Sequence, residues 1–388
     1  MTNDLVSKKL LEIRHSNAYR TRLPLDSPQG VYITVDGQRC LSFCSNDYLG
    51  LANDPRVCHA ATDAIQRYGV GSGASQFISG YTTVHAQLEE QLAAFLNYPR
   101  CILFSSGYLA NLGTISTFAP HYSYILQDKL NHASIIDAAS YSRSRLKRYR
   151  HLQTQHASAI IRSENHNPCL IVTDGVFSME GSIAPLQSLI KLKHQGQHML
   201  MVDDAHGIGV LGRCGLGTIE HNLVDTTDVD VLIGTFGKAF GVSGAFVAGC
   251  DSLIEYLLQQ TRTLIYTTAP PAALAAAALQ SLKIIINEPQ RRDRLHDNIR
   301  YFRRCAQQAS LSLLDSITAI QGLIIGNNEL ALACSDKLRQ QGILALAIRP
   351  PTVPKNSARI RITLSSEHTH EHIDRLVSSL ASIVTKPV

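Results

Sequence analysis

The sequence predicts an α/β fold, with a mostly parallel central sheet covered by helices and a smaller C-terminal α+β domain. Between residues 101 and 249, short apolar runs alternate with polar or helical segments. Strands that are buried on both faces of a parallel sheet have this pattern. After residue 287 the pattern changes to a charged helix and shorter strands, which indicates a second region. The chain has 388 residues, which is long enough for more than one domain.

Six apolar runs are the expected strands of the large domain. They are Cys101–Phe104, Tyr124–Leu126, Cys169–Thr173, Met199–Val202, Val229–Ile233 and Ala245–Ala248. The apolar stretch Ala269–Leu282 contains Pro270 and Pro271, and it is shorter than the ~20 residues that a membrane span needs. We therefore expect it to form a buried helix with proline at its start.

Both ends of the chain have patterns of their own. Apolar residues at helical spacing within Met1–Ser16 predict a helix, and this segment lacks the continuous apolar core of a signal peptide. Near the C-terminus we expect a charged helix over Arg291–Gln307, and strands near Ile317–Ile325 and Ala358–Leu364 with a helix between them. Three regions are expected: an N-terminal helix and strand arm over residues 1–45, a large domain over 46–285 and a small domain over 286–388.

The composition is that of an ordinary soluble globular protein. Hydrophobic residues make up 45% and charged residues 17% of the chain, and the formal net charge is +5. The basic residues form only local clusters such as Arg143–Arg150, which we interpret as a solvated helix face, so neither nucleic acid nor a membrane is an expected partner. The nine cysteines include no CxxC pair, which favours reduced thiols and a cytoplasmic location.

The polar residues that close the expected strands form the candidate site, because ligands of parallel α/β sheets gather at the carboxyl ends of the strands. Asp203 directly follows one of these strands, and the glycine-flanked Lys238 lies 35 positions later, after another. Pyridoxal phosphate (PLP) chemistry needs a lysine that forms a Schiff base and a buried carboxylate that keeps the pyridine nitrogen protonated. The pair Asp203 and Lys238 therefore predicts a PLP enzyme.

Three other interpretations compete with this one. Gly207–Gly212 fits the GxGxxG pattern of a nicotinamide-dependent oxidoreductase, but more glycines follow where that dinucleotide fingerprint requires a helix. Lys238 is followed by alanine, which excludes a nucleotide P-loop. Asp203, Asp204 and His206 could ligate a metal, yet no second cluster at ligand spacing supports such a site, and no metal is expected.

Six colinear segments make the chain resemble the α-oxoamine synthases, a family of fold-type I PLP-dependent transferases, over nearly its whole length. The segments are Ser45–Leu51, Leu130–Ser134, Asp174–Gly181, Val202–Gly207, Thr235–Gly241 and Ile348–Pro354. The resemblance implies an acyltransferase that condenses an amino acid with an acyl thioester and releases carbon dioxide. Within the family, the chain is most similar to members that join L-alanine to a pimeloyl thioester, carried by CoA or an acyl carrier protein, in biotin biosynthesis. Members that use glycine or serine with a different acyl-CoA remain an alternative.

The resemblance also implies which residues bind the cofactor and act in catalysis. Lys238 would carry the PLP, Asp203 would pair with the pyridine nitrogen, and His132 would stack on the ring and polarise a carbonyl during decarboxylation. Ser178 and His206 would contact the ring hydroxyl, and His206 is also expected to act in catalysis. The phosphate would be bound by Gly107, Tyr108 and Thr235.

Substrate contacts follow from the same resemblance. Arg361, on the alternating strand Ala358–Leu364, is expected to bind the amino-acid carboxylate with its guanidinium fork. The other expected substrate contacts, at matched family positions or motifs, are Arg20, Asn46, His132 and Thr352. Gly69–Gly80 follows the family's glycine-rich segment, with Ala74 and Gln76 as departures, and in the family this segment lies near a site shared between subunits. The resemblance therefore implies a homodimer.

Overall fold

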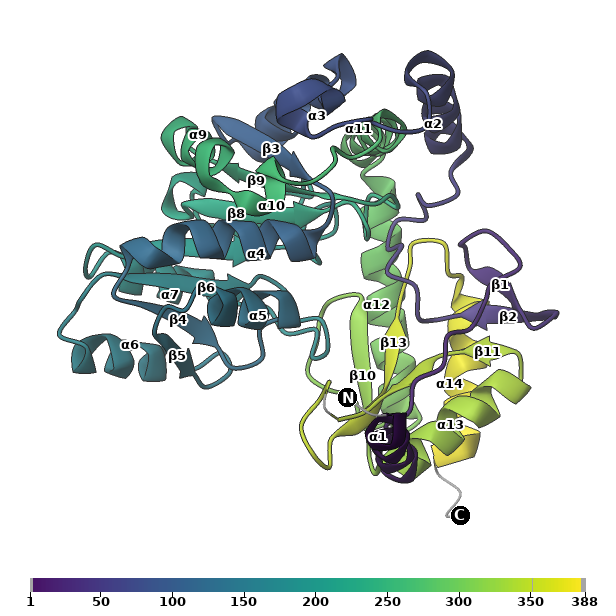
Figure 1. The fold of residues 1–388 in the computed structure, drawn as a ribbon. Coiled ribbons are helices and arrows are strands. Elements are labelled where there is room, and N and C mark those ends of the chain that lie inside the picture. The colour runs from purple at the N-terminus through teal and green to yellow at the C-terminus, as the bar shows by residue number, and fades with distance from the viewer. Residues whose placement is uncertain (1–2, 351, 385–388) are drawn as a thin grey trace. The chain divides into compact units, whose positions relative to one another are not determined.

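The computed structural model describes residues 3–350 and 352–384 (Figure 1). It divides into two compact units. Unit 1 comprises the described residues up to Tyr48, Met179–Gly181 and the described residues from Asp293 onward, and unit 2 comprises Leu49–Ser178 and Ser182–Arg292. The N-terminal segment thus belongs to the same unit as the C-terminal region, and the boundaries expected at residues 45 and 285 stay a prediction.

Unit 2 contains a seven-stranded sheet in the order β3-β9-β8-β7-β6-β4-β5. β9 pairs antiparallel with both of its neighbours, while the other pairs in the sheet are parallel, so the expected mostly parallel sheet is confirmed. All six predicted strands are present, some shifted by one or two residues. The strands are β3 (Arg100–Phe104), β4 (Tyr124–Asp128), β5 (Leu146–Tyr149), β6 (Cys169–Asp174), β7 (Met199–Asp203), β8 (Val231–Thr235) and β9 (Ala245–Gly249).

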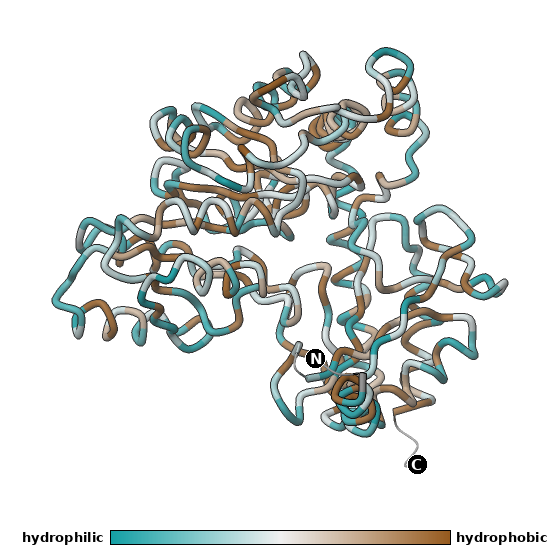
Figure 2. The backbone as a smooth tube through the Cα atoms, in the orientation of Figure 1, coloured by the Kyte–Doolittle hydropathy of each residue, from teal (hydrophilic) through white to brown (hydrophobic). Residues whose placement is uncertain are grey.

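The core of unit 2 lies between this sheet and the helices that cover it. Every residue of β6 and β7 is buried, which explains why their sequences are continuous apolar runs (Figure 2). Side chains of the strands, such as Val172 and Ile233, pack in one cluster with Ile115, Ile135 and Ile254 of three helices. The helices of unit 2 are α2 (Pro55–Tyr68), α3 (Thr83–Leu96), α4 (Gly107–Phe118), α5 (Ala133–Tyr141), α6 (Thr154–Ser163), α7 (Leu186–Lys193), α8 (Thr218–His221), α9 (Asp251–Gln260), α10 (Arg262–Ile265) and α11 (Ala272–Asn287).

The basic cluster Arg143–Arg150 is not a helix face, so that interpretation was wrong. Leu146–Tyr149 forms β5, the edge strand that pairs with β4. Its Tyr149 side chain is buried, while Lys147 forms an ion pair with Glu164 at 2.7 Å. Charged residues are common on edge strands because they discourage pairing with another chain, which accounts for the misleading composition.

Unit 1 holds two three-stranded sheets. One has the order β1-β2-β11, with β1 (Tyr32–Val35), β2 (Gln38–Ser42) and β11 (Ile343–Leu344). The other is antiparallel in the order β10-β13-β12, with β10 (Ile320–Gly326), β12 (Leu346–Ile348) and β13 (Ala358–Thr363). Its helices are α1 (Asn3–His15), α13 (Asn328–Gln340) and α14 (His370–Val384), and α12 (Gln290–Gln308) runs from unit 2 into unit 1.

Apart from the helix face expected at Arg143–Arg150, the expected helices are present. α1 and α12 agree with the predicted ranges to within a few residues, and α13 lies between the two predicted strands β10 and β13. The apolar stretch near Pro271 forms α11, with this proline as its N-cap residue. In the part of the chain that the structure describes, no helix combines the length and the apolar character that crossing a membrane demands.

Candidate active site

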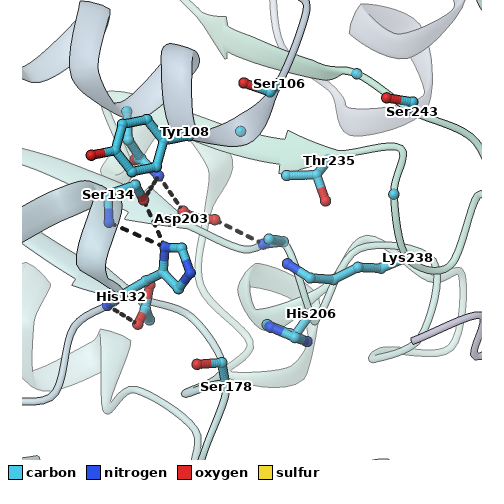
Figure 3. A pocket seen from close by; sticks show the side chains of 16 residues that line it. Ser106, Tyr108, His132, Ser134, Ser178, Asp203, His206, Thr235, Lys238 and Ser243 are labelled. Atoms are coloured by element: carbon cyan, nitrogen blue, oxygen red, sulfur yellow. Dashed lines mark hydrogen bonds between the residues drawn. The ribbon is translucent and has the colours of Figure 1, made fainter. Parts of the chain in front are cut away.

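A pocket of about 260 Å³ lies within unit 2, at the carboxyl ends of β3, β6, β7 and β8 (Figure 3). Parallel α/β sheets place ligands at this edge. All eight residues predicted to contact the cofactor line this pocket: Gly107, Tyr108, His132, Ser178, Asp203, His206, Thr235 and Lys238. Residues that are far apart in the sequence are therefore brought together as expected, while their individual roles remain a prediction.

Asp203 is the last residue of β7, and hydrogen bonds hold its carboxylate in place. Asn111 Nδ2, from α4, donates to Oδ2 at 2.6 Å, and the backbone N of Ala205 donates to Oδ1 at 3.1 Å. The side chain is 6% exposed. A buried carboxylate with both oxygens oriented can accept a further hydrogen bond from a protonated ring nitrogen.

His132 is the N-cap residue of α5. Its Nδ1 lies 2.8 Å from Ser134 Oγ and accepts from the backbone N of Ser134 at 3.3 Å, while its own backbone N donates to Asp174 Oδ2 at 2.8 Å. Burial lowers the pKa of His132, the charge of Asp203 opposes this change, and the charge of Lys238 lowers the pKa further. The ring is thus fixed by its neighbours and favoured in its neutral form.

The first turn of α4 offers a cradle for an anion. Ser106 is its N-cap, with a side chain that accepts from the backbone N of Leu109 at 3.2 Å, and the amides that follow carry the partial positive charge of a helix N-terminus. A Cβ on Gly107 would lie 2.6 Å from Thr235 Cγ2, so a larger residue there would fill the cradle. The Thr235 Oγ1 atom is buried without a hydrogen-bond partner among residues 3–350 and 352–384.

These groups fit pyridoxal phosphate. A buried, unpartnered hydroxyl beside a helix N-terminus suits the phosphate, an oriented carboxylate suits the pyridine nitrogen, and Lys238 supplies the amine. The aromatic ring of His132 and the hydroxyl of Ser178 line the same space (Figure 3). The chemistry of this donor set matches the cofactor that the sequence predicts.

Asp204 lies behind the pocket, enclosed by three glycines. A Cβ on Gly175, Gly207 or Gly217 would come within 2.4 Å of an Asp204 carboxylate oxygen, and Oδ2 accepts from the backbone N of Thr218 at 2.6 Å. Burial raises the pKa of Asp204 to about 8. This carboxyl group supports the turn after β7 from inside the protein.

Asn111 and Ser134 line the pocket but were not predicted. Ser134 lies in the matched segment Leu130–Ser134, and Asn111 lies one helical turn after Gly107. That spacing places Asn111 on the face of α4 that carries Gly107. Ser134 could therefore have been found within its matched segment, and Asn111 by its helical spacing from the predicted Gly107.

The substrate contacts predicted from unit 1 form two pairs. Arg361 on β13 is buried and donates to Asn46 Oδ1 at 3.2 Å and to Thr363 Oγ1 at 2.8 Å. Arg20 donates to Thr352 Oγ1 at 3.2 Å, and both residues line a cavity of about 600 Å³ in this unit. In the matched segment Ile348–Pro354, residue 351 lies outside the described residues.

The other arginine of β13 has a structural partner. Arg359 forms an ion pair with Glu180 at 3.2 Å and donates to the carbonyl of Met179 at 3.2 Å. Its side chain is 5% exposed. Arg361 donates to neutral oxygens of Asn46 and Thr363, and it remains the residue predicted to bind the amino-acid carboxylate.

The GxGxxG segment does not form a dinucleotide site. Gly207–Gly212 lies in turns, and the next helix, α8, begins at Thr218. The dinucleotide fold needs a helix whose N-terminus starts at those glycines. This geometry opposes the nicotinamide-dependent alternative.

Comparison with known proteins identifies the class. Residues 38–380 match the family model for aminotransferase class I and II, and the chain belongs to this family. It is 48% identical to the 8-amino-7-oxononanoate synthase of Methylococcus capsulatus over 99% of both chains. It is 47% identical to the enzyme of the same name from Nitrosococcus oceani, over 97% of this chain and 100% of that one.

Solved structures agree with this class and with the fold-type I architecture. A serine palmitoyltransferase from S. paucimobilis with a bound PLP–myriocin aldimine has a TM-score of 0.92 at 26% identity, covering 98% of this chain and 96% of its own. The 8-amino-7-oxononanoate synthase of Francisella tularensis has a TM-score of 0.78 at 34% identity, covering 89% of this chain and 98% of its own. The α-oxoamine synthase resemblance is thereby confirmed.

Proposed function

We propose that this protein is a PLP-dependent acyltransferase that condenses L-alanine with a pimeloyl thioester, releasing carbon dioxide and forming 8-amino-7-oxononanoate for biotin biosynthesis. One observation carries the proposal. Lys238, Asp203 and the anion cradle of α4 converge in a single pocket, in a chain 48% identical to an enzyme of that name. A fold alone would not justify it, because one fold hosts many reactions.

Lys238 and Asp203 perform the central tasks. When bound, PLP stores the electron pair that remains after a bond to the amino-acid α-carbon breaks. The Nζ of Lys238 would hold the cofactor and would remove the α-proton of the bound amino acid as a base. Asp203 keeps a proton on the pyridine nitrogen, a task for which its two fixed oxygens are suited.

The other pocket residues position the reacting groups. His132 would stack on the cofactor ring and polarise the substrate carbonyl, while Ser178 and His206 would contact the ring hydroxyl. The backbone at Gly107 and Tyr108 and the hydroxyl of Thr235 hold the phosphate. Tyr108 itself is anchored by its hydroxyl, which donates to Asp137 Oδ2 at 2.6 Å.

Unit 1 supplies the groups that recognise the substrate. Arg361, held by Asn46, binds the amino-acid carboxylate as a bidentate fork. The 600 Å³ cavity combines apolar walls, including Leu23 and Leu344, with the cation Arg20. An apolar chain with a carboxylate at its far end, such as a pimeloyl group, matches this lining.

A second candidate is another α-oxoamine synthase, which would use glycine or serine with a different acyl-CoA. It is favoured by the TM-score of serine palmitoyltransferase, which is 0.92, whereas that of the 8-amino-7-oxononanoate synthase from Francisella tularensis is 0.78. Sequence identity favours the enzyme that uses alanine, because the chain is 48% identical to the 8-amino-7-oxononanoate synthase of Methylococcus capsulatus and 26% identical to the serine palmitoyltransferase. We give identity more weight, because substrate choice depends on the side chains of the pocket and TM-score compares backbones.

We also propose that the enzyme is a cytoplasmic homodimer that accepts the pimeloyl group from CoA or an acyl carrier protein. The glycine-rich segment exposes large apolar side chains, with Val70 76% and Ile78 80% exposed in the single chain. A subunit interface would bury such residues. The nine unpaired cysteines fit a reducing compartment.

Borohydride trapping tests the cofactor assignment. Reduction of the PLP-loaded protein followed by peptide mapping is expected to place the label on Lys238. Lys238→Ala should lose the label and at least ~10²-fold in kcat, since the base is gone. Lys193→Ala, which removes a lysine paired with Asp230 outside the pocket, is the matched control. A label on any other lysine would disprove the assignment.

Competing substrates test the reaction. Release of carbon dioxide and free thiol is measured with alanine, glycine or serine, each offered with pimeloyl, acetyl and palmitoyl thioesters. Alanine with pimeloyl thioester is expected to give the highest kcat/KM. Preference for serine with a long-chain donor, or for glycine, would replace this assignment with the second candidate.

A further inference from the structure

A chain of hydrogen bonds joins Asp203 to His132 through two residues without an assigned role. Asn111 Nδ2 donates to Asp203 Oδ2 at 2.6 Å and to Ser134 Oγ at 2.9 Å. Ser134 Oγ in turn lies 2.8 Å from His132 Nδ1. Figure 3 shows this path as dashed lines between Asp203, Ser134 and His132. Asn111 and Ser134 are both almost fully buried, at 0% and 1% exposed, so solvent does not compete for these bonds.

The donors and acceptors along this chain are determined by chemistry. An ionised carboxylate only accepts, so the group of Asn111 that faces Asp203 must be its NH₂. The second hydrogen of that NH₂ goes to Ser134 Oγ. Because Ser134 Oγ accepts from Asn111, its own hydrogen is available for His132 Nδ1.

A second donor points at the same nitrogen. The backbone N of Ser134 donates to His132 Nδ1 at 3.3 Å, which is the N-cap bond of α5. A backbone N–H cannot accept, so Nδ1 has to carry a lone pair here. A neutral imidazole that accepts at Nδ1 carries its proton on Nε2.

The surroundings disfavour a second proton on the ring. His132 caps α5, and the positive end of the helix dipole opposes a cation at this position. The charged groups that act on the ring are Lys238, which opposes protonation, and Asp203 and Asp137, which favour it; Asp174 contacts only the backbone N. Protonating Nδ1 would also break the bonds from Ser134 that fix the ring.

We propose that Asn111 and Ser134 are positioning residues that hold His132 as a neutral imidazole with its proton on Nε2. His132 then acts on the substrate by donating a hydrogen bond from Nε2 to an acceptor oxygen, and does not transfer a proton as an imidazolium acid. The same hydrogen bonds connect the His132 ring to the Asp203 carboxylate through Ser134 and Asn111, so they fix the separation between His132 and Asp203. The role of His132 toward the substrate rests on the proposed function, whereas the tautomer of His132 does not.

Nitrogen NMR tests the tautomer without any turnover. Protein labelled with ¹⁵N-histidine and loaded with PLP gives separate shifts for protonated and unprotonated ring nitrogens, and the His132 signals are identified by their absence in His132→Gln. At neutral pH we expect an unprotonated Nδ1 and a protonated Nε2. A protonated Nδ1, or an imidazolium, would overturn the proposal whatever the enzyme's substrates are.

Variants test whether the chain of bonds sets this state. Ser134→Ala removes the hydroxyl and should move the Nδ1 shift and lower kcat about 10-fold, with the label on Lys238 retained. Ser134→Thr keeps a hydroxyl and should restore both. Ser106→Ala, a serine of the same pocket that bonds Leu109 and not His132, is the matched control and should leave the His132 shifts unchanged. Unchanged His132 shifts in Ser134→Ala would refute the positioning role.

Discussion

At the scale of single residues, His368 shows how a buried side chain can make stability depend on pH. Its ring stacks on Phe43 with centroids 4.2 Å apart. Nδ1 accepts from the backbone N of Ser365 at 2.9 Å, so Nε2, which lies 2.9 Å from the carbonyl O of Ser42, is the donor. Burial lowers the pKa of His368 to about 4. The folded protein therefore holds this ring in its neutral form.

We expect unit 1 to lose stability as pH falls from about 6.5, the ordinary histidine pKa, to about 4. In that range the unfolded chain binds a proton that the folded chain does not, so the free energy of unfolding decreases by up to about 3 kcal/mol. In His368→Gln, which keeps a donor and an acceptor, this part of the pH dependence should disappear. Urea unfolding at several pH values measures it.

The exposed His59 provides the control for this prediction. Its side chain is 77% exposed, and its contact with Asp63 is 3.4 Å long. His59→Gln should leave the pH dependence of unfolding as it is in the parent protein. If both variants gave the same pH dependence as the parent, His368 would not be the group responsible.

Eight of the sixteen residues that line the pocket were predicted individually, because they follow strands or lie in long matched segments. Lys238 and Asp203 stand out in the sequence by their type and place. Asn111 and Ser134 do not, since asparagine and serine occur in many structural settings and only the meeting of α4 with α5 gives these two a shared task. The chemical type of a residue can be read from the sequence, whereas contacts between residues far apart in the sequence depend on the fold.

At the scale of elements, the segment after β8 positions Lys238 through its backbone. The N of Gly241 donates to the carbonyl of Lys238 at 2.8 Å, and the N of Val242 donates to the carbonyl of Phe236 at 2.7 Å. Gly241 has a φ of 67°, and a Cβ there would lie 2.3 Å from the backbone N of Ala52. A side chain at this position would therefore meet both unfavourable torsion and rigid backbone.

We expect Gly241→Ala to destabilise the protein by several kcal/mol, because the strain of positive φ, about 1 kcal/mol, adds to a backbone clash. The matched control is Gly37→Ala. Gly37 has a φ of 73° but nothing within 4 Å of its Cβ position, so only the torsional cost of about 1 kcal/mol remains. Urea unfolding of both variants gives the comparison, and equal losses would show that the contact with Ala52 is unimportant.

The elements themselves were predictable to different degrees. Central strands such as β6 and β7 are buried on both faces, so their apolar runs are unambiguous. β5 was missed because an edge strand needs apolar residues on fewer positions, and Arg148 and Lys147 hid its pattern. The short strands β11 and β12 were also not predicted, since two or three residues carry no periodicity.

At the scale of the whole molecule, burial divides the nine cysteines into classes. All nine are unpaired, and four are buried: Cys40, Cys101, Cys169 and Cys334. Three are exposed: Cys58, Cys214 and Cys250. Burial raises the pKa of Cys169 to about 12 and that of Cys101 well above its ordinary value. The thiols of Cys101 and Cys169 are thus both inaccessible and favoured in their protonated form.

A thiol reagent that gives a coloured product should therefore label the native protein in two stages. We expect Cys58, Cys214 and Cys250 to react quickly and the four buried cysteines to react only on unfolding. Cys58→Ser should remove one equivalent from the fast stage and leave the slow stage unchanged. Rapid reaction of all nine thiols in the folded protein would contradict the burial described here. Because the nine cysteines form no disulfide bond, a reducing agent should not change the melting temperature.

The expected cofactor residues and the expected substrate residues belong to different units, and this has a consequence for engineering the enzyme toward new substrates. The residues expected to handle the cofactor belong to unit 2, whereas Arg361, Arg20 and Thr352, which are expected to recognise substrates, belong to unit 1. Variant libraries that randomise only the residues lining the cavity of unit 1 would thus test new acyl donors, while the predicted cofactor-binding residues of unit 2 stay unchanged. A catalyst for unnatural amino ketones could be sought in this way, with cofactor colour as a simple screen for surviving scaffolds.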